Sequence, residues 1–505
     1  MLSVAGTFGM PLQHAHAVYG GGCGADGDLG AGRGPEVVVG LPNTNADAGA
    51  IDVWATDRYA TLTLASLSGT ASAAGDRFGA AVTVMDVNCD RANDLVVGAP
   101  GADHGRGRVY VVLDPLSDQK PATVFVVGRG QNEGAHFGAA IAAAGPVGPD
   151  QGPLISDLWI GAPGTDLSSA YQQEGAVNHY TSTRGGQGTW LGLDLVETLR
   201  PETPGVDSVL VDGHYGAALA TSPGRVLIGA PDAGWREASH AGFVKERRRV
   251  DGGATFEHPF LWSRETPGVP GNPTTGDRFG ASLASSREIS LIGAPGVDVG
   301  KADDAGSVLM TTDVGSWSLP DRTFTYGQEG IPGKPRSGDH LGQAVALGDN
   351  LGCAGLFQMQ AAFGAPGRDV KHKGRQRDDA GAVVVVPTTN LYGECKDATI
   401  LDQSHELAGT PEAGDHVGAA LGVLRYTEDV PGNGLGDRVL VGAPGEDWQG
   451  KKNAGIVQAG AAVPPGIVDP RAIPVSHSYR TSLTNSHGPR KNLRYGAVLA
   501  GELGI

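Results

Sequence analysis

Four oxygen-bearing side chains in one short segment have the spacing of a cation-binding loop. They are Asp86, Asn88, Asp90 and Asp94, at positions 1, 3, 5 and 9 of the segment. Alternate side chains of a tight turn converge on one point, a main-chain carbonyl near position 7 can join them, and Ca²⁺ accepts many oxygen ligands in irregular geometry. Position 6 is Arg91, where glycine is usual. The pattern predicts a Ca²⁺ site, and the alternative is an Asx-rich turn without metal.

The segment lies between two short motifs that recur along the chain. One is an apolar run that ends in Gly-Ala-Pro or Gly-Leu-Pro, with its glycine at Gly40, Gly98, Gly161, Gly229, Gly293, Gly364 and Gly442. The other is a small-polar stretch followed by an aromatic or aliphatic residue and glycine, at Phe78-Gly79, Phe137-Gly138, Tyr215-Gly216, Phe279-Gly280, Leu341-Gly342, Val417-Gly418 and Tyr495-Gly496. Phe8-Gly9 is a candidate eighth copy. The two motifs alternate in order, so the chain is a tandem repeat.

Each repeat contains about four strand-like segments. A third apolar run follows each Gly-Ala-Pro, as at Arg108–Val112, and a weaker fourth precedes the next aromatic-Gly motif, as at Ala122–Val127. Four strands in about 60 to 70 residues is the size of a propeller blade, and stacking blades radially covers both faces of each small sheet. We therefore predict an all-β fold, a single seven-bladed β-propeller occupying residues 1–505 with clear repeats over about 20–501.

The two ends of the repeat array suggest how the ring closes. The first clear motif is the Gly40 half and the last is Tyr495-Gly496, so pairing them would complete one blade from both termini. Phe8-Gly9 completing that blade is the alternative. Glycine in both motifs would permit close approach of main chains, and proline would end the strand.

These motifs resemble the FG-GAP repeat of integrin α subunits, which also occurs in the C-terminal part of GPI-specific phospholipase D. The linkers, such as Thr-Pro-Gly-Val-Pro-Gly before Gly276, look like those of secreted bacterial FG-GAP proteins. The resemblance implies a seven-bladed propeller. It also implies an integrin-type calcium hairpin with Asp86, Asn88, Asp90 and Asp94 as ligands.

The corresponding loops of other repeats have lost most of these oxygen groups. The groups that remain are Asp28 and Glu36 in the first repeat, Asp157 in the third, and Glu428, Asp429, Asn433 and Asp437 in the seventh. The fourth and fifth repeats are too short for such a loop, because Gly216 and Gly229, like Gly280 and Gly293, are only 13 residues apart. We expect one cation site, or at most two.

A second set of acidic residues recurs after Gly-Ala-Pro-Gly, and its members are Asp103, Asp166, Asp298, Asp369 and Asp447. They could form a ring, but turn capping explains them more simply, and we expect the latter. His14 and His16 are two histidines without a third ligand, which is a weak metal motif.

Composition limits the partners. Glycine makes up 81 of 505 residues, and the formal net charge of −17 argues against nucleic acid, which needs clustered basic residues. The basic runs Lys245–Arg249 and Lys371–Arg377 are interpreted as solvated loops. No apolar run is long enough to span a membrane, and Met1–Gln13 shows no signal peptide. The true N-terminus stays open.

Four cysteines are present, namely Cys23, Cys89, Cys353 and Cys395. An even number without a Cys-x-x-Cys motif weakly favours disulfides in an exported protein, and four reduced structural thiols are the alternative. Cys23–Cys89 and Cys353–Cys395 are the pairings that repeat positions suggest.

Two classes of function remain. The first is a secreted or cell-surface adhesion module, a monomer rather than an obligate oligomer, which binds Ca²⁺ and recognises an extracellular protein or glycan. The second is a secreted hydrolase acting on a glycan or a lipid head group, with its site on the propeller face or in the channel. The sequence holds no Gly-x-Ser-x-Gly, His-Glu-x-x-His or P-loop motif, and it favours binding over catalysis.

Overall fold

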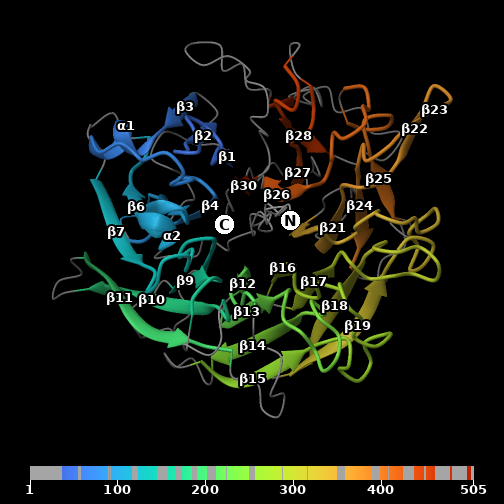
Figure 1. Cartoon of the computed structure of the whole chain (residues 1–505), viewed down its shortest axis with the longest axis horizontal. Coiled ribbons are helices and arrows are strands. Elements are labelled where there is room, and N and C mark those ends of the chain that lie inside the picture. The colour runs from blue at the N-terminus through green and yellow to red at the C-terminus, as the bar shows by residue number, and fades with distance from the viewer. Residues whose placement is uncertain are drawn as a thin grey trace, which may run out of the picture.

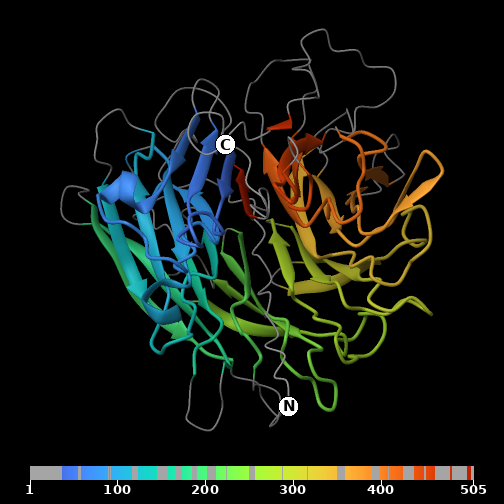
Figure 2. The same ribbon diagram turned by 45° about the horizontal axis from the view of Figure 1, so that its top comes forward.

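A computed structural model of the chain shows a ring of small sheets around a central axis (Figures 1 and 2). The residues that the structure describes are 37–54, 59–88, 90, 92–116, 123–144, 157–166, 173–184, 190–201, 212–222, 224–249, 256–286, 288–314, 317–349, 359–388, 398–407, 409–424, 437–447, 451–460, 478–479 and 498–501. They form seven four-stranded antiparallel sheets, one additional hairpin and two short helices, α1 (Leu64–Ser68) and α2 (Ala102–Gly105).

Each sheet is one blade, and its strands run outward in chain order from the axis in all blades but the first. Blade one contains β30 (Val498–Gly501), β1 (Val37–Gly40), β2 (Ile51–Trp54) and β3 (Tyr59–Leu62). Blade two contains β4 (Ala81–Met85), β5 (Asp94–Ala99), β6 (Arg108–Leu113) and β7 (Thr123–Arg129). Blade three contains β8 (Ala140–Ala144), β9 (Asp157–Ala162), β10 (Ala176–Arg184) and β11 (Trp190–Leu199).

The remaining four blades repeat this arrangement. Blade four contains β12 (Ala218–Ser222), β13 (Arg225–Ala230), β14 (Phe243–Arg249) and β15 (Phe256–Trp262). Blade five contains β16 (Ser282–Ser285), β17 (Ile289–Ala294), β18 (Ser307–Val314) and β19 (Trp317–Phe324). Blade six contains β20 (Ala344–Asp349), β21 (Met359–Ala365), β24 (Ala382–Pro387) and β25 (Thr399–Leu401). Blade seven contains β26 (Ala420–Leu424), β27 (Arg438–Ala443), β28 (Ile456–Gly460) and β29 (Ser478–Tyr479).

The inner strands close the ring. Each of β4, β8, β12, β16, β20, β26 and β30 contacts the inner strand of the next blade, and β30 contacts both β26 and β4 (Figure 1). In blade one, β30 from the C-terminal end pairs with β1 from the N-terminal end, with Val37 opposite Gly501 and Gly40 opposite Val498. The predictions of a seven-bladed propeller and of closure by both termini are confirmed. Phe8-Gly9 lies outside the described residues.

The aromatic or aliphatic residue of each Phe-Gly motif fills the space between blades. All six described residues of this kind are at most 2% exposed, namely Phe78, Phe137, Tyr215, Phe279, Leu341 and Val417. The apolar clusters that contain them span neighbouring blades, as where Phe137 packs with residues of blades two and three. The core is therefore a set of seams between blades, and no single blade holds a core of its own.

Glycine is required where main chains of neighbouring blades meet. Gly79, the glycine of the Phe-Gly motif of blade two, has φ +90°, and a Cβ there would lie 2.4 Å from the main-chain oxygen of Ala50 in blade one. Gly98 has no such φ restriction, but its Cβ would lie 2.0 Å from the main-chain oxygen of Gly138 in blade three. These contacts explain why glycine recurs in both motifs.

One expectation about loops is wrong. The run Lys245–Arg249 lies in strand β14 of blade four, and it is not a solvated loop. The second run, Lys371–Arg377, forms a hairpin of β22 (Val370–His372) and β23 (Arg375–Arg377), and most of its residues are exposed, as expected for a solvated segment.

Candidate functional site

The predicted cation loop connects β4 to β5 in blade two. Asp86 directly follows β4, and Asp94 begins β5 opposite Met85. The strand pairing therefore fixes the distance between positions 1 and 9 of the loop. Asp86 is 1% exposed and Asp94 is fully buried, whereas Asn88 is half-buried and Asp90 is exposed.

The side chains of the loop turn toward one another. The main-chain N–H of Asp90 donates to Asp86 Oδ1 at 3.2 Å and to Asn88 Oδ1 at 3.0 Å. Asn88 Nδ2 donates to Asp90 Oδ2 at 2.7 Å, and the N–H of Ala92 donates to Asp90 Oδ1 at 2.9 Å. These are the hydrogen bonds of Asx turns, and they bring the oxygen atoms of positions 1, 3 and 5 together.

Asp94 makes the base of the loop electrostatically unusual. Burial, followed by the smaller effect of the negative charges of Asp90 and Asp86, raises the pKa of its carboxyl to about 8, against hydrogen bonds from the N–H groups of Val87 and Asp114. Burial and the charge of Asp90 also raise the pKa of Asp114. A divalent cation would remove this mutual repulsion.

The donor set therefore suits Ca²⁺ in type, because it consists of hard oxygen atoms only. In the part of the chain that the structure describes, however, no three His, Cys, Asp or Glu side chains surround a common metal position. Binding a cation would require Asp86, Asn88 and Asp90 to exchange the Asx-turn hydrogen bonds for metal contacts.

The other candidate ligands are arranged differently. Asp157 at the start of β9 is 1% exposed and is paired with Arg249 and with His179, whose Nε2 lies 2.8 Å from Asp157 Oδ1. Asp437 is buried and directly precedes β27. The remaining loop candidates, the four cysteines and the two N-terminal histidines lie outside the described residues, namely Asp28, Glu36, Glu428, Asp429, Asn433, Cys23, Cys89, Cys353, Cys395, His14 and His16.

Four of the five acidic residues that follow Gly-Ala-Pro-Gly cap turns. Asp166, Asp298 and Asp447 each accept a main-chain N–H six or seven residues later, at 2.9 Å in all three cases. Asp369 accepts the N–H of Asp379 at 3.2 Å, and Asp103 lies 3.4 Å from Arg129. The turn-capping interpretation therefore holds for four of these residues, whereas Asp103 pairs with arginine side chains of β6 and β7.

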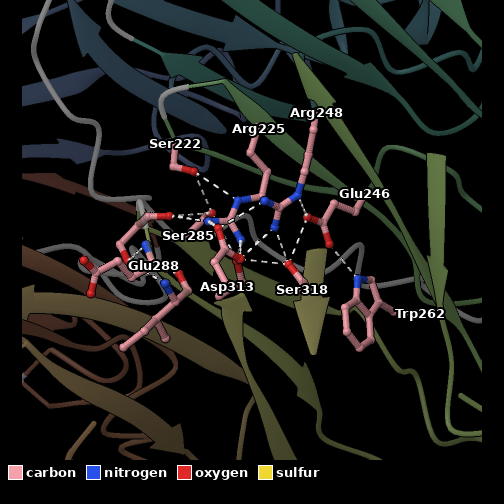
Figure 3. A network of polar contacts seen from close by, with 12 residues as sticks. Ser222, Arg225, Glu246, Arg248, Trp262, Ser285, Glu288, Asp313 and Ser318 are labelled. Atoms are coloured by element: carbon pink, nitrogen blue, oxygen red, sulfur yellow. Dashed lines mark hydrogen bonds and ion pairs between the residues drawn. The ribbon is translucent and has the colours of Figure 1, made fainter. Parts of the chain in front are cut away.

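A buried network in blades four and five was not predicted (Figure 3). Arg225 stands four residues before Gly229, as Asp94 stands four residues before Gly98, so a cation occupies the strand position of the buried carboxylate in blade two. Arg225 is 3% exposed and donates to both carboxylate oxygens of Asp313 on β18, at 3.1 and 3.0 Å. It also donates to Ser290 Oγ at 2.9 Å.

Arg248 on β14 extends this network. It donates to Asp313 at 2.7 Å and to Glu246 at 2.6 Å, and Glu246 also accepts the indole N–H of Trp262 at 2.8 Å. In the two blades that are too short for a cation loop, arginine side chains thus supply the positive charge at the seam.

The same strand also joins blade four to blade three. Arg247 contacts Glu197 on β11 at 3.1 Å, and Arg249 contacts Asp157 on β9. Successive side chains of a strand point to opposite faces, so Arg247 and Arg249 serve the seam with blade three while Arg248 serves the seam with blade five. This alternation along Lys245–Arg249 is the sequence signal that could have revealed both networks.

His179 is fully buried in the seam between blades three and four. Its ring stacks on Trp159 with centroids 3.8 Å apart. Burial disfavours its charged form, but the hydrogen bonds that Asp157 and Glu197 accept from its ring, together with their negative charges, outweigh this and raise the pKa of His179. The basic groups between blades three and four, namely His179, Arg247 and Arg249, are therefore each placed beside a carboxylate.

No helix in the described ranges is both long and apolar enough to cross a lipid bilayer.

Comparisons with known proteins agree with the repeat structure. The family model described as FG-GAP repeat matches residues 78–112, which contain the Phe78-Gly79 motif, the acidic loop and Gly98-Ala-Pro. Integrin alpha-4 of Xenopus laevis is 26% identical over 283 residues, which cover 55% of this chain and 24% of that protein. Integrin alpha-5 of Xenopus laevis is 32% identical over 160 residues, which cover 30% of this chain and 14% of that protein. The chain thus matches a quarter or less of the length of these relatives.

Among solved structures, the periplasmic gluconolactonase PpgL of Pseudomonas aeruginosa is 13% identical to this chain. The match covers 93% of this chain and 99% of that one, with a TM-score of 0.39.

Proposed function

We propose that this chain, an integrin-like FG-GAP propeller, is an extracellular binding module that recognises a protein or a glycan and holds Ca²⁺ in blade two. The observation that carries the proposal is the acidic loop between β4 and β5, set inside a complete ring of FG-GAP blades. We further propose that the chain acts as a monomer, since the ring leaves no blade unpaired.

Calcium would stiffen the exposed part of the loop between β4 and β5. Asp86 and Asp94 are held by β4 and β5, and Asn88 and Asp90 complete the oxygen set. A bound Ca²⁺ supplies positive charge that offsets the repulsion between these carboxylates. The protein's part is to keep two buried carboxylates at a fixed separation and to present the exposed half of the loop to the outside.

A hydrolase would need several carboxylates converging on the channel or on one face. The described inner strands consist mainly of alanine, valine, leucine, serine and threonine, and Asp349 is the one acidic residue within them. This observation supports the binding module over the hydrolase with a channel site.

The proposal is tested by binding of the purified chain to immobilised extracellular-matrix proteins and to a glycan array, in Ca²⁺ and in EGTA. We expect retention on at least one member of the panel in Ca²⁺. We expect EGTA or Asp90→Ala to weaken the affinity for that ligand about tenfold or more. Without Ca²⁺ the loop must be ordered when the ligand binds, and this ordering costs binding free energy.

The matched control is Asp298→Ala, which removes an acidic residue of a turn in blade five and leaves the blade-two loop intact. It should bind as the parent does. Absence of binding across the whole panel, together with turnover of a glycan or phospholipid substrate, would overturn the proposal in favour of the hydrolase.

A further inference from the structure

The turn that precedes the inner strand contains a buried aspartate in several blades. In blades five, six and seven it is Asp277, Asp339 and Asp415, each at most 1% exposed. Each accepts the main-chain N–H three residues before it, at 2.6 to 2.8 Å. The three carboxyl groups thus occupy one repeat position, and their surroundings can be compared directly.

In two of these blades the carboxylate has a basic partner. Arg264 lies 2.8 Å from Asp277, and Arg368 lies 2.6 Å from Asp339. Arg368 is the residue that follows Gly-Ala-Pro-Gly in blade six, and its guanidinium stacks over Tyr326 at 4.0 Å. An arginine beside a buried carboxylate favours its ionised form.

Blade seven has an acid where blade six has that arginine. The residue that follows Gly-Ala-Pro-Gly there is Glu446, which is 8% exposed, and the main-chain N–H of Gly445 beside it donates to the main-chain oxygen of Asp415 at 3.0 Å. The side chains of Glu446 and Asp415 interact through a hydrogen bond. Gln403 Nε2 donates to Glu446 Oε2 at 2.6 Å. The other charged groups that act on the pair are Glu412 and Asp447, which are also acidic.

Among the described residues, no lysine, arginine or histidine forms an ion pair with Asp415 or Glu446. Two carboxylates cannot hydrogen-bond to each other unless one of them carries a proton, and two buried like charges in contact repel strongly. The contact between the two side chains therefore requires a proton.

We propose that Asp415 and Glu446 share one proton, and that this proton closes the turn leading into blade seven, so that the blade is held more firmly in mildly acidic than in alkaline surroundings. The inference is independent of the calcium loop, which lies in blade two. In blade six burial also raises the pKa of Asp339, but the positive charge of Arg368 opposes this rise, so the corresponding turn there should depend less on pH.

The direction of the pH dependence follows from the titration of the pair. Burial, and then the charges of Glu446 and Glu412, raise the pKa of Asp415 to about 8, and burial likewise raises the pKa of Glu446. In the unfolded chain aspartate and glutamate have a pKa of about 4. Between these values the folded chain binds more protons than the unfolded chain, so this pair's contribution to stability falls as pH rises.

The test is the melting temperature of the full chain at about pH 5.5 and about pH 8, for the parent and for Glu446→Arg, which copies Arg368. We use the Asp90→Ala background so that the blade-two loop does not respond to metal. The parent should lose on the order of 3 °C more than Glu446→Arg over this interval. His179 titrates in both proteins, so its effect cancels in the comparison.

Asp415→Asn provides a second variant if Glu446→Arg fails to fold, because it keeps the shape of the side chain and removes one charge. It should melt higher than its parent at alkaline pH and show the flatter dependence. Parallel pH curves for the parent and the variants would overturn the proposal. So would a rise in the melting temperature with added Ca²⁺ or Mg²⁺ at alkaline pH that Asp415→Asn abolishes, because a cation and not a proton would then join the two carboxyls.

Discussion

Replacing Gly98 by alanine is expected to prevent the propeller from folding, or to destabilise it by about 4 kcal/mol or more, which is beyond the usual range of single substitutions. The added Cβ would lie 2.0 Å from the main-chain oxygen of Gly138 and 3.3 Å from the side chain of Ile141. Both neighbours belong to the next blade, and Gly138 is fixed there by donating to the main-chain oxygen of Gly161 at 2.9 Å. The seam can accept the methyl group only by opening.

Gly276→Ala is the matched control. Gly276 has φ +91°, so alanine there is strained by about 1–2 kcal/mol, but its Cβ would meet no atom within 4 Å. Urea denaturation of both variants separates backbone strain from the clash between blades. Equal stabilities for Gly98→Ala and Gly276→Ala would contradict the view that the glycine of Gly-Ala-Pro serves the approach of neighbouring blades.

The second large effect is expected for Arg225→Ala, at about 3–5 kcal/mol of unfolding free energy, because removing one partner of a buried ion pair leaves the other without compensation. Arg225 is 3% exposed and joins β13 of blade four to Asp313 of blade five through two hydrogen bonds. Arg248 remains beside Asp313 in the variant, which keeps the cost below that of removing both cations.

Arg236→Ala serves as the control for this prediction. Its side chain is 71% exposed and lies 2.6 Å from Glu265, so its loss should cost at most about 1 kcal/mol. Chemical denaturation at several salt concentrations is the measurement. A cost below about 1 kcal/mol for Arg225→Ala would show that the network does not hold the two blades together.

The fold was predictable because its repeat marks the places where main chains meet. Phe137-Gly138 and Gly98-Ala-Pro are short local motifs, but the two glycines meet where neighbouring blades contact each other. The order of such motifs along the chain therefore gives the order of blades around the ring. Ring closure was predictable for the same reason, since the half-motifs at the two ends are complementary.

The polar seams were not predictable from spacing. Arg225 and Asp313 are 88 positions apart, and nothing local to either residue marks the other as its partner. The run Lys245–Arg249 predicted a solvated loop because a run of basic residues between two strand-like segments is usually a solvated connection. In a propeller both faces of a blade are buried, so such a strand instead pairs with carboxylates on either side.

Hydrogen bonds join Asp86, Asn88 and Asp90, and Asp94 lies at the base of the same loop, because β4 and β5 hold both ends of the segment. That these four residues bind a cation stays a prediction. What spacing could not give is the burial of Asp94, which the sheet around it determines. That burial is what makes the negative charge of the loop costly without a cation.

The measurement that tests the central claim most directly is a thermal melt in EGTA and in excess Ca²⁺, on the parent, on Asp90→Ala and on the control Asp298→Ala. A hundredfold excess over Kd stabilises the folded state by about 2.7 kcal/mol, so the parent and Asp298→Ala should both melt several degrees higher in Ca²⁺. Asp90→Ala should gain much less. If the parent does not respond, or if Asp90→Ala responds as the parent does, the blade-two loop is a turn without a metal, and the likeness to integrin heads is one of fold alone.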